Sequence, residues 1–117
     1  MTQSSVENTL EEARDAIRRH AWREAFDLLT AIDASDGLSA EDLERLAESA
    51  WWTGRLDDCI QARERSFVAY MEQGNSRRAA FVAIELVFDH YGKLAPAVAA
   101  GWSSRAIRLL ETEPDCV

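Results

Sequence analysis

Proline, glycine and cysteine are scarce in this chain, and the shortage of cysteine excludes a class of protein. The 117 residues include two Pro, five Gly and two Cys, the latter being Cys59 and Cys116. Two cysteines cannot supply the disulfide framework of a small secreted domain, and the first residues carry neither the basic region nor the apolar run of a secretory signal. The sequence therefore predicts a cytoplasmic protein in which Cys59 packs within a helix.

Long apolar runs and an excess of basic residues are also missing. No stretch approaches the roughly 18 to 20 apolar residues that a membrane span requires. The chain has 21 Asp and Glu against 13 Lys and Arg, which gives a net charge of −8. Phosphate backbones are repelled by such a charge on average, so the sequence predicts neither a membrane protein nor a direct nucleic-acid binder.

Residues of common catalytic and metal sites are scarce as well. His20 and His90 are the only histidines, and no nucleophile motif accompanies them. The His and Cys positions lack the short ligand spacings of a zinc site, Asp57-Asp58 lacks the alternating oxygen ligands of a calcium loop, and no glycine-rich phosphate cradle is present. Cys59 and His90 approach each other only across adjacent hairpins, where ordinary packing is the favoured interpretation. We expect a protein that is not an enzyme and uses no metal or cofactor.

Helical periodicity, by contrast, extends along the whole chain. Apolar residues recur at spacings of three and four in six segments, and no alternating strand pattern appears. Ser39 with Asp42 predicts a helix cap, and Pro96 stands where a first helical turn tolerates proline. These segments predict a single domain, 1–117, of three helical hairpins at about 6–33, 40–73 and 76–111.

The first two hairpins are related by an offset of 34 residues. Ala13, Ala16, Trp22, Ala25 and Phe26 correspond to Ala47, Ala50, Leu56, Cys59 and Ile60, and a third copy follows after 40 residues with Val87, His90, Pro96, Ala99 and Ala100. Small residues recur because antiparallel helices approach to about 8 to 10 Å only where the crossing side chains are small. A period of 34 is typical of tetratricopeptide arrays, so we predict an all-α fold, a right-handed array (α-α superhelix) of about three such hairpins. The six additional residues of the third copy are expected to lengthen the helices around Tyr70 to Arg78.

Three runs carry a resemblance to a known family. They are residues 13–29 (ARDAIRRHAWREAFDLL), 38–47 (LSAEDLERLA) and 50–58 (AWWTGRLDD), and the similarity extends through Gly101-Trp102 to the closing residues 109–116. These runs resemble the N-terminal tetratricopeptide-like (TPR-like) region of large actinobacterial transcriptional regulators of the LuxR type. The resemblance implies a role in transcriptional or signalling regulation. Those regulators end in a basic helix-turn-helix that contacts DNA, and this chain stops before any such segment, so DNA binding is not carried over.

Partner-binding residues are expected on the first helix of each hairpin, because these helices line the inner curve of stacked hairpins. The candidates are Arg14, Glu48, Trp51, Trp52, Phe88 and Tyr91. The competing interpretation is that such aromatic side chains form the core. The best-known peptide clamp of this fold, basic and amide side chains that hold a terminal carboxylate, is absent from these positions, which favours a protein or peptide partner with basic or apolar segments.

The sequence thus favours a noncatalytic protein-interaction module, with two alternatives. One is a small-molecule sensor whose aromatic pocket takes a ligand. The other is a fragment of a larger regulator that forms a homodimer through its last helix. That helix has no successor to cover its outer side, and Trp102 and Leu110 are the residues expected at the contact.

Overall fold

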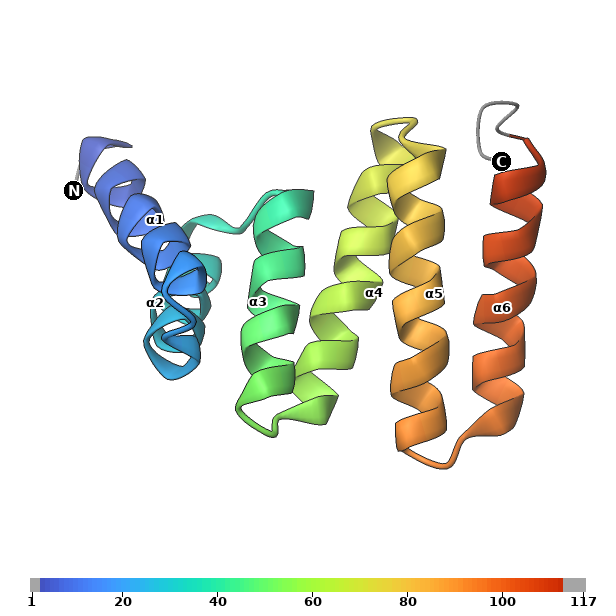
Figure 1. Cartoon of the computed structure of the whole chain (residues 1–117). Coiled ribbons are helices and arrows are strands. Elements are labelled where there is room, and N and C mark those ends of the chain that lie inside the picture. The colour runs from blue at the N-terminus through green and yellow to red at the C-terminus, as the bar shows by residue number, and fades with distance from the viewer. Residues whose placement is uncertain (1–2, 113–117) are drawn as a thin grey trace.

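The computed structural model describes residues 3–112, which form six α-helices with no strand among them. The helices are α1 (Gln3–Arg18), α2 (Trp22–Asp36), α3 (Ala40–Trp52), α4 (Leu56–Glu72), α5 (Ser76–Gly92) and α6 (Pro96–Glu111). They lie side by side in chain order, with α1 and α6 at opposite ends (Figure 1). The predicted all-α array is confirmed, and with extents of 43 × 31 × 23 Å it is an open row rather than a closed bundle.

The turns within the three hairpins share one backbone geometry. In each turn an N–H donates to the carbonyl five residues earlier at 2.8 Å, in the pairs Ala21 to Ala16, Arg55 to Ala50 and Ala95 to His90. The residue before each donor is left-handed, with φ of 59° at His20, 77° at Gly54 and 58° at Leu94. Glycine adopts this conformation freely, whereas His20 and Leu94 each carry strain of about 1 kcal/mol.

The longer spacing of the third copy comes from helix length. Helix α4 has 17 residues against 15 in α2, and α5 has 17 against 13 in α3. The differences of two and four residues account for the six additional residues between the second and third copies. The prediction that the helices around Tyr70 to Arg78 are lengthened is confirmed.

Small side chains lie at the helix crossings of every hairpin. Ala13, Ala25, Ala47, Cys59 and Ala99 are all 0% exposed. Around them the apolar side chains form two clusters, one spanning α1 to α4 and the other centred on α4, α5 and α6. Close helix approach at these crossings leaves no room for a larger residue.

Enlarging one of these crossings should destabilise the fold. Ala99→Leu places an isobutyl group in a fully buried position of α6, and we expect the free energy of unfolding to fall by roughly 1 to 3 kcal/mol through overpacking. Ala100→Leu adds the same group to the adjacent, exposed position and should change stability by less than about 0.5 kcal/mol. Urea unfolding of both variants measures the difference, and equal stabilities would contradict the crossing assignment.

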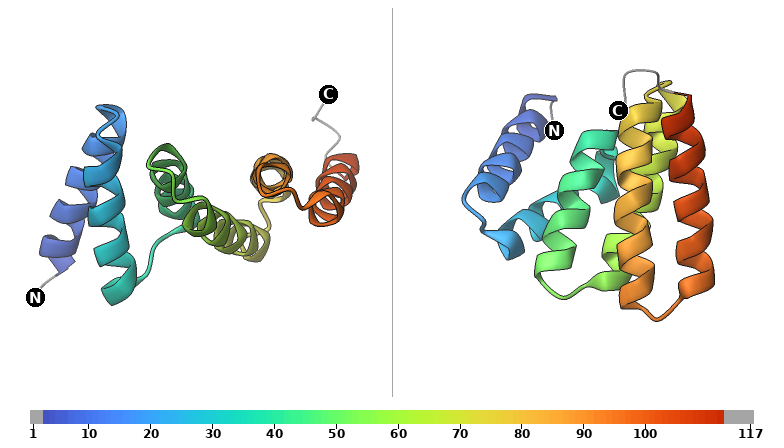
Figure 2. Two further views of the ribbon diagram at one scale, coloured as in Figure 1. Left: turned by 90° about the horizontal axis from the view of Figure 1, so that it is seen from below. Right: turned by 45° about the vertical axis from the view of Figure 1, so that its right-hand side comes forward.

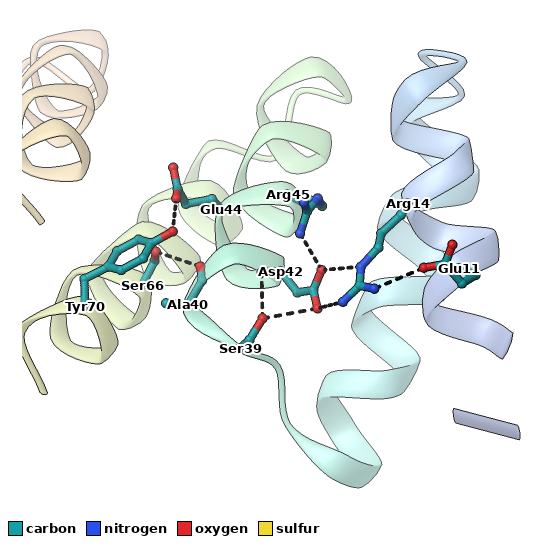
Figure 3. A network of polar contacts seen from close by, with 9 residues as sticks. All are labelled: Glu11, Arg14, Ser39, Ala40, Asp42, Glu44, Arg45, Ser66 and Tyr70. Atoms are coloured by element: carbon teal, nitrogen blue, oxygen red, sulfur yellow. Dashed lines mark hydrogen bonds and ion pairs between the residues drawn. The ribbon is translucent and has the colours of Figure 1, made fainter. Parts of the chain in front are cut away.

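Ion pairs join the first hairpin to the rest of the array (Figure 3). The carboxylate of Asp42 on α3 is 2% exposed and accepts two hydrogen bonds from Arg14 of α1, at 3.2 and 2.8 Å, and one from Arg45 at 2.8 Å. The Ser39 hydroxyl accepts from the Asp42 N–H at 3.1 Å, which confirms the predicted cap of α3. Farther along, Asp33 of α2 pairs with Arg65 of α4 at 2.7 and 2.8 Å.

These two aspartates make stability depend on pH. Burial raises the pKa of Asp42, but hydrogen bonds and charge from Arg14 and Arg45 outweigh it and hold the pKa below its usual value. The Arg65 hydrogen bond lowers the pKa of Asp33 in the same direction. Because both folded-state pKa values are depressed, their contribution is present above the unfolded value near 3.8 and is lost as pH falls below it.

We therefore expect urea unfolding to show that wild type exceeds Asp42→Asn in stability at pH 6 and that the gap shrinks at pH 3. The substitution removes the titrating carboxylate while keeping its shape, so the change in the gap isolates the Asp42 contribution from other acids. A gap that stays constant between the two pH values would contradict the ion-pair assignment.

Candidate partner-binding cleft

A cleft of about 480 Å³ opens between α3 and α5, over α4. Figure 2 (left) shows α3 and α5 on one side of α4, so the first helices of the second and third hairpins form its two rims. The lining residues are Glu41, Glu44, Arg45, Glu48, Trp51 and Trp52 from α3, Arg63 and Tyr70 from α4, and Arg78 and Glu85 from α5. The cleft is thus charged and aromatic, and all six of its α3 residues point into one space.

One end of the cleft is crossed by a three-residue bridge. The Tyr70 hydroxyl of α4 donates to Glu44 of α3, and the Arg78 guanidinium of α5 donates to the same carboxylate. Glu44 is 19% exposed, and burial of the phenol together with its hydrogen bond to Glu44 raises the pKa of Tyr70 to about 12. The phenol therefore stays neutral and remains a hydrogen-bond donor. The bridge joins α3, α4 and α5 at this end of the cleft.

A buried ion pair lies at the floor of the cleft. Arg63 of α4, whose side chain is 11% exposed, pairs with Asp89 of α5, 2% exposed, at 2.6 Å. The Cys59 thiol lies 3.8 Å from the same carboxylate. Burial, together with the charge of Asp89, raises the pKa of Cys59 to about 12, although Arg63 opposes the shift. The thiol is therefore protonated at neutral pH and packs against the ion pair as a weak donor.

Internal pairing leaves the cleft with an excess of negative charge. Arg45, Arg63 and Arg78 have close carboxylate partners in Asp42, Asp89 and Glu44. Three further glutamates line the cleft, namely Glu41, Glu48 and Glu85. Within residues 5–112, Glu41 and Glu48 make no ion pair, and Glu85 reaches only the already paired Arg63 at 3.7 Å.

The same three glutamates are not equivalent. Burial raises the pKa of Glu85, and the nearby charges of Glu44 and Asp89 raise it further, while Arg63 lowers it. A carboxylate in this position is destabilised by its surroundings. A further cation beside it would favour the charged form.

Exposed aromatic rings lie on both helices that form the rims of the cleft. Trp51 and Trp52 line the cleft while 48% and 56% exposed, in edge contact with centroids 4.9 Å apart. On α5 the residues Phe81, Phe88 and Tyr91, here called the α5 stripe, are 47%, 70% and 56% exposed. Their spacing of seven and three places them on one side of the helix. Unlike core aromatics, these rings remain available for contact.

The predicted partner residues fall into two groups. Glu48, Trp51 and Trp52 come together in the cleft, whereas Phe88 and Tyr91 belong to the α5 stripe and do not line it. Arg14 is also absent from the lining, since its guanidinium holds α1 against Asp42. As partner contacts all six residues stay predictions, with Arg14 already committed to an internal ion pair.

The residues predicted for self-association are differently placed. Trp102 is 7% exposed and packs edge to face on Phe67 of α4, with ring centroids 5.1 Å apart, beneath the guanidinium of Arg105. Its ring is covered by its own chain because it faces α4 and α5 rather than outward. Leu110 is partly exposed, and the strongly exposed apolar side chains of α6 are Val98 and Ile107. A contact with a second copy through Trp102 would require this packing to open.

The sequence prediction missed all four lining residues that come from α4 and α5, namely Arg63, Tyr70, Arg78 and Glu85. Tyr70 reads as one apolar position among several on α4, and Arg78 as part of a solvated helix start. Their role depends on α4 forming the floor between two rims, which no pattern within one helix reveals. The signal that does exist is a charged residue, Glu85, within the apolar run 79–88.

Residues 3–112 contain neither a metal-binding cluster nor a membrane-spanning helix. His, Cys, Asp and Glu side chains form no group of three or more that could hold a metal ion. No helix there combines the length and the apolar character needed to cross a bilayer. Cys116 lies outside the described residues.

Comparison with known proteins establishes the fold. No protein-family model matches the sequence, and no curated protein does. Among solved structures the chain is similar to that described as the crystal structure of PcrH in complex with the chaperone binding region of PopB, with a TM-score of 0.74 and 15% identity over 99% of this chain and 89% of that one. That structure is a TPR-like helical protein, so the TPR-like helical fold predicted here is confirmed. The relationship to LuxR-type regulators stays a prediction.

Proposed function

We propose that this protein is a noncatalytic interaction module that binds a segment of a partner protein in the cleft between α3 and α5. The observation that carries the proposal is an open cleft with half-exposed tryptophans on one rim and the α5 stripe beside the other. Exposed aromatic rings combine large contact area with little loss of side-chain freedom on binding, which makes them common binding hot spots. The similar PcrH structure contains a bound region of PopB, which supports a polypeptide as the ligand of this fold.

A small molecule is the second candidate for the same cleft. Its volume of about 480 Å³ falls within the range of ligand pockets. Such pockets are lined mainly by apolar groups, whereas seven of the ten residues here are Glu or Arg. The charged lining favours a polypeptide, whose backbone and side chains can satisfy several charged groups at once.

The biological role is proposed from the sequence alone. The resemblance to the N-terminal region of LuxR-type regulators supports a part in transcriptional or signalling regulation in the cytoplasm. Binding of a regulatory partner in the cleft is the mechanism that joins this role to the geometry.

Selection of peptides tests the interaction function. Random peptides displayed on phage are selected against the immobilised protein, and their dissociation constants are then measured for wild type, Trp51→Ala and Val68→Ala. Trp51→Ala should weaken binding at least about thirty-fold, because it removes an anchoring ring. Val68 is 53% exposed but does not line the cleft, so Val68→Ala should bind like wild type. Failure to select any peptide, or equal weakening by both variants, would contradict the proposal.

A further inference from the structure

Three arginines line the cleft, and the groups around one of them, Arg78, show what the lining accepts. Arg78 extends from α5 to the Glu44 carboxylate of α3. Its Cζ atom also lies 5.9 Å from the centroid of Tyr70 and 5.7 Å from that of Phe81. A carboxylate combined with aromatic rings is a favourable setting for a guanidinium, through charge-assisted hydrogen bonds and cation–π attraction.

The other end of the cleft offers the same kinds of group, but the guanidinium nearest to it, that of Arg63, is already paired with Asp89. Glu48 and Trp51 on α3 and Glu85 on α5 line the space, and neither glutamate has an ion-pair partner of its own there. Glu48 stands one turn before Trp51 and Trp52, so the carboxylate and the two rings share one side of α3. Carboxylates and rings are present, and the missing component is a positive charge that is not already paired with another carboxylate.

We propose that this end of the cleft, defined by Glu48, Trp51 and Glu85 and here called the cation site, binds an arginine or lysine side chain of the bound segment. The proposal rests on the proposed function and names the chemistry of its ligand: a segment in which basic side chains alternate with apolar ones. The basic side chain occupies the cleft, and the apolar neighbours lie on the α5 stripe. Charge complementarity carries the assignment, since a net charge of −8 and two glutamates without a cation of their own both disfavour an acidic segment.

Three synthetic peptides test the cation site by tryptophan fluorescence titration. They alternate leucine with arginine, with serine or with glutamate. The leucine-arginine peptide should bind about ten-fold or more tightly than the leucine-serine peptide, and the leucine-glutamate peptide should bind more weakly than either. Raising the salt concentration should weaken only the first.

Matched double variants separate binding at the cation site from general attraction between an acidic protein and a basic peptide. Glu48→Gln with Glu85→Gln removes two charges from the cleft, and Glu64→Gln with Glu72→Gln removes two from outside it. Only the first pair should weaken leucine-arginine binding, by about ten-fold, and it should leave leucine-serine binding unchanged.

The outcomes distinguish the two proposals. Equal binding of the arginine and serine peptides, or equal losses of affinity in the two double variants, would contradict the cation site. Either result would leave the proposed interaction function intact. Peptides selected by phage display provide the independent check of that function. Weaker binding of every selected peptide by Trp51→Ala, combined with no preference for arginine, would place a different chemistry in the cleft.

Discussion

Replacing Asp89 with Asn should lower the free energy of unfolding by roughly 3 to 5 kcal/mol. The carboxylate is 2% exposed and its partner Arg63 is 11% exposed, so the substitution leaves a guanidinium without a counter-charge in the interior. The remaining acid near Arg63 is Glu85, whose oxygen lies 3.7 Å away and is itself half exposed. Loss of Asp89 therefore removes the buried ion pair that joins α4 to α5. Urea unfolding followed by circular dichroism measures the effect.

Asp57→Asn provides the matched control because Asp57 of α4 pairs with Lys93, the residue that follows α5. Their side chains are 83% and 42% exposed, so the pair is largely solvated, and the substitution should change stability by less than about 1 kcal/mol. Restoring an apolar interior with Asp89→Leu and Arg63→Met together should recover much of the loss. Equal effects of Asp89→Asn and Asp57→Asn would mean that burial does not set the strength of these ion pairs.

Truncating Trp102 should cost a similar amount, roughly 3 to 5 kcal/mol for Trp102→Ala. The indole fills the space between α6 and the second apolar cluster, with Phe67 against its edge and Arg105 over its face. Removing it leaves a cavity that neighbouring helices can close only in part. The measurement is again urea unfolding, combined with light scattering at high protein concentration.

Ile107→Ala is the control on the same helix. Ile107 is 56% exposed, so its truncation should cost under about 1 kcal/mol. The pair also tests self-association: if Trp102 mediates a dimer, its variant should change molecular mass rather than stability. A stable, monomeric Trp102→Ala protein derived from a dimeric wild type would contradict the packing role assigned here.

Local patterns predicted the helices well because each depends on residues close in sequence. The small residues at positions such as Ala25 and Ala99 mark crossings, and Ser39 with Asp42 marks a cap, since both signals act within one hairpin. Even the longer third copy follows from chain spacing, because a repeat can gain residues only where helices lengthen or turns expand.

The cleft was less predictable because its lining comes from three helices. Trp51 and Trp52 are recognisable from the sequence, because two adjacent rings on a helix point in different directions and cannot both face the same core. The pairing of Arg78 with Glu44 or of Arg63 with Asp89, by contrast, depends on how neighbouring hairpins stack. Arg14 illustrates the limit most clearly. Its position on a first helix suggested a groove residue, whereas the adjoining Asp42 gives it a structural partner.

The most direct test of partner binding in the cleft is an NMR spectrum that records the indole N–H signals of the four tryptophans. Each gives one signal, assigned by single Trp→Phe variants, and peptide selected on the immobilised protein is then added. The account predicts that the signals of Trp51 and Trp52 shift while that of the buried Trp102 stays in place. Unchanged Trp51 and Trp52 signals in the presence of bound peptide would contradict it.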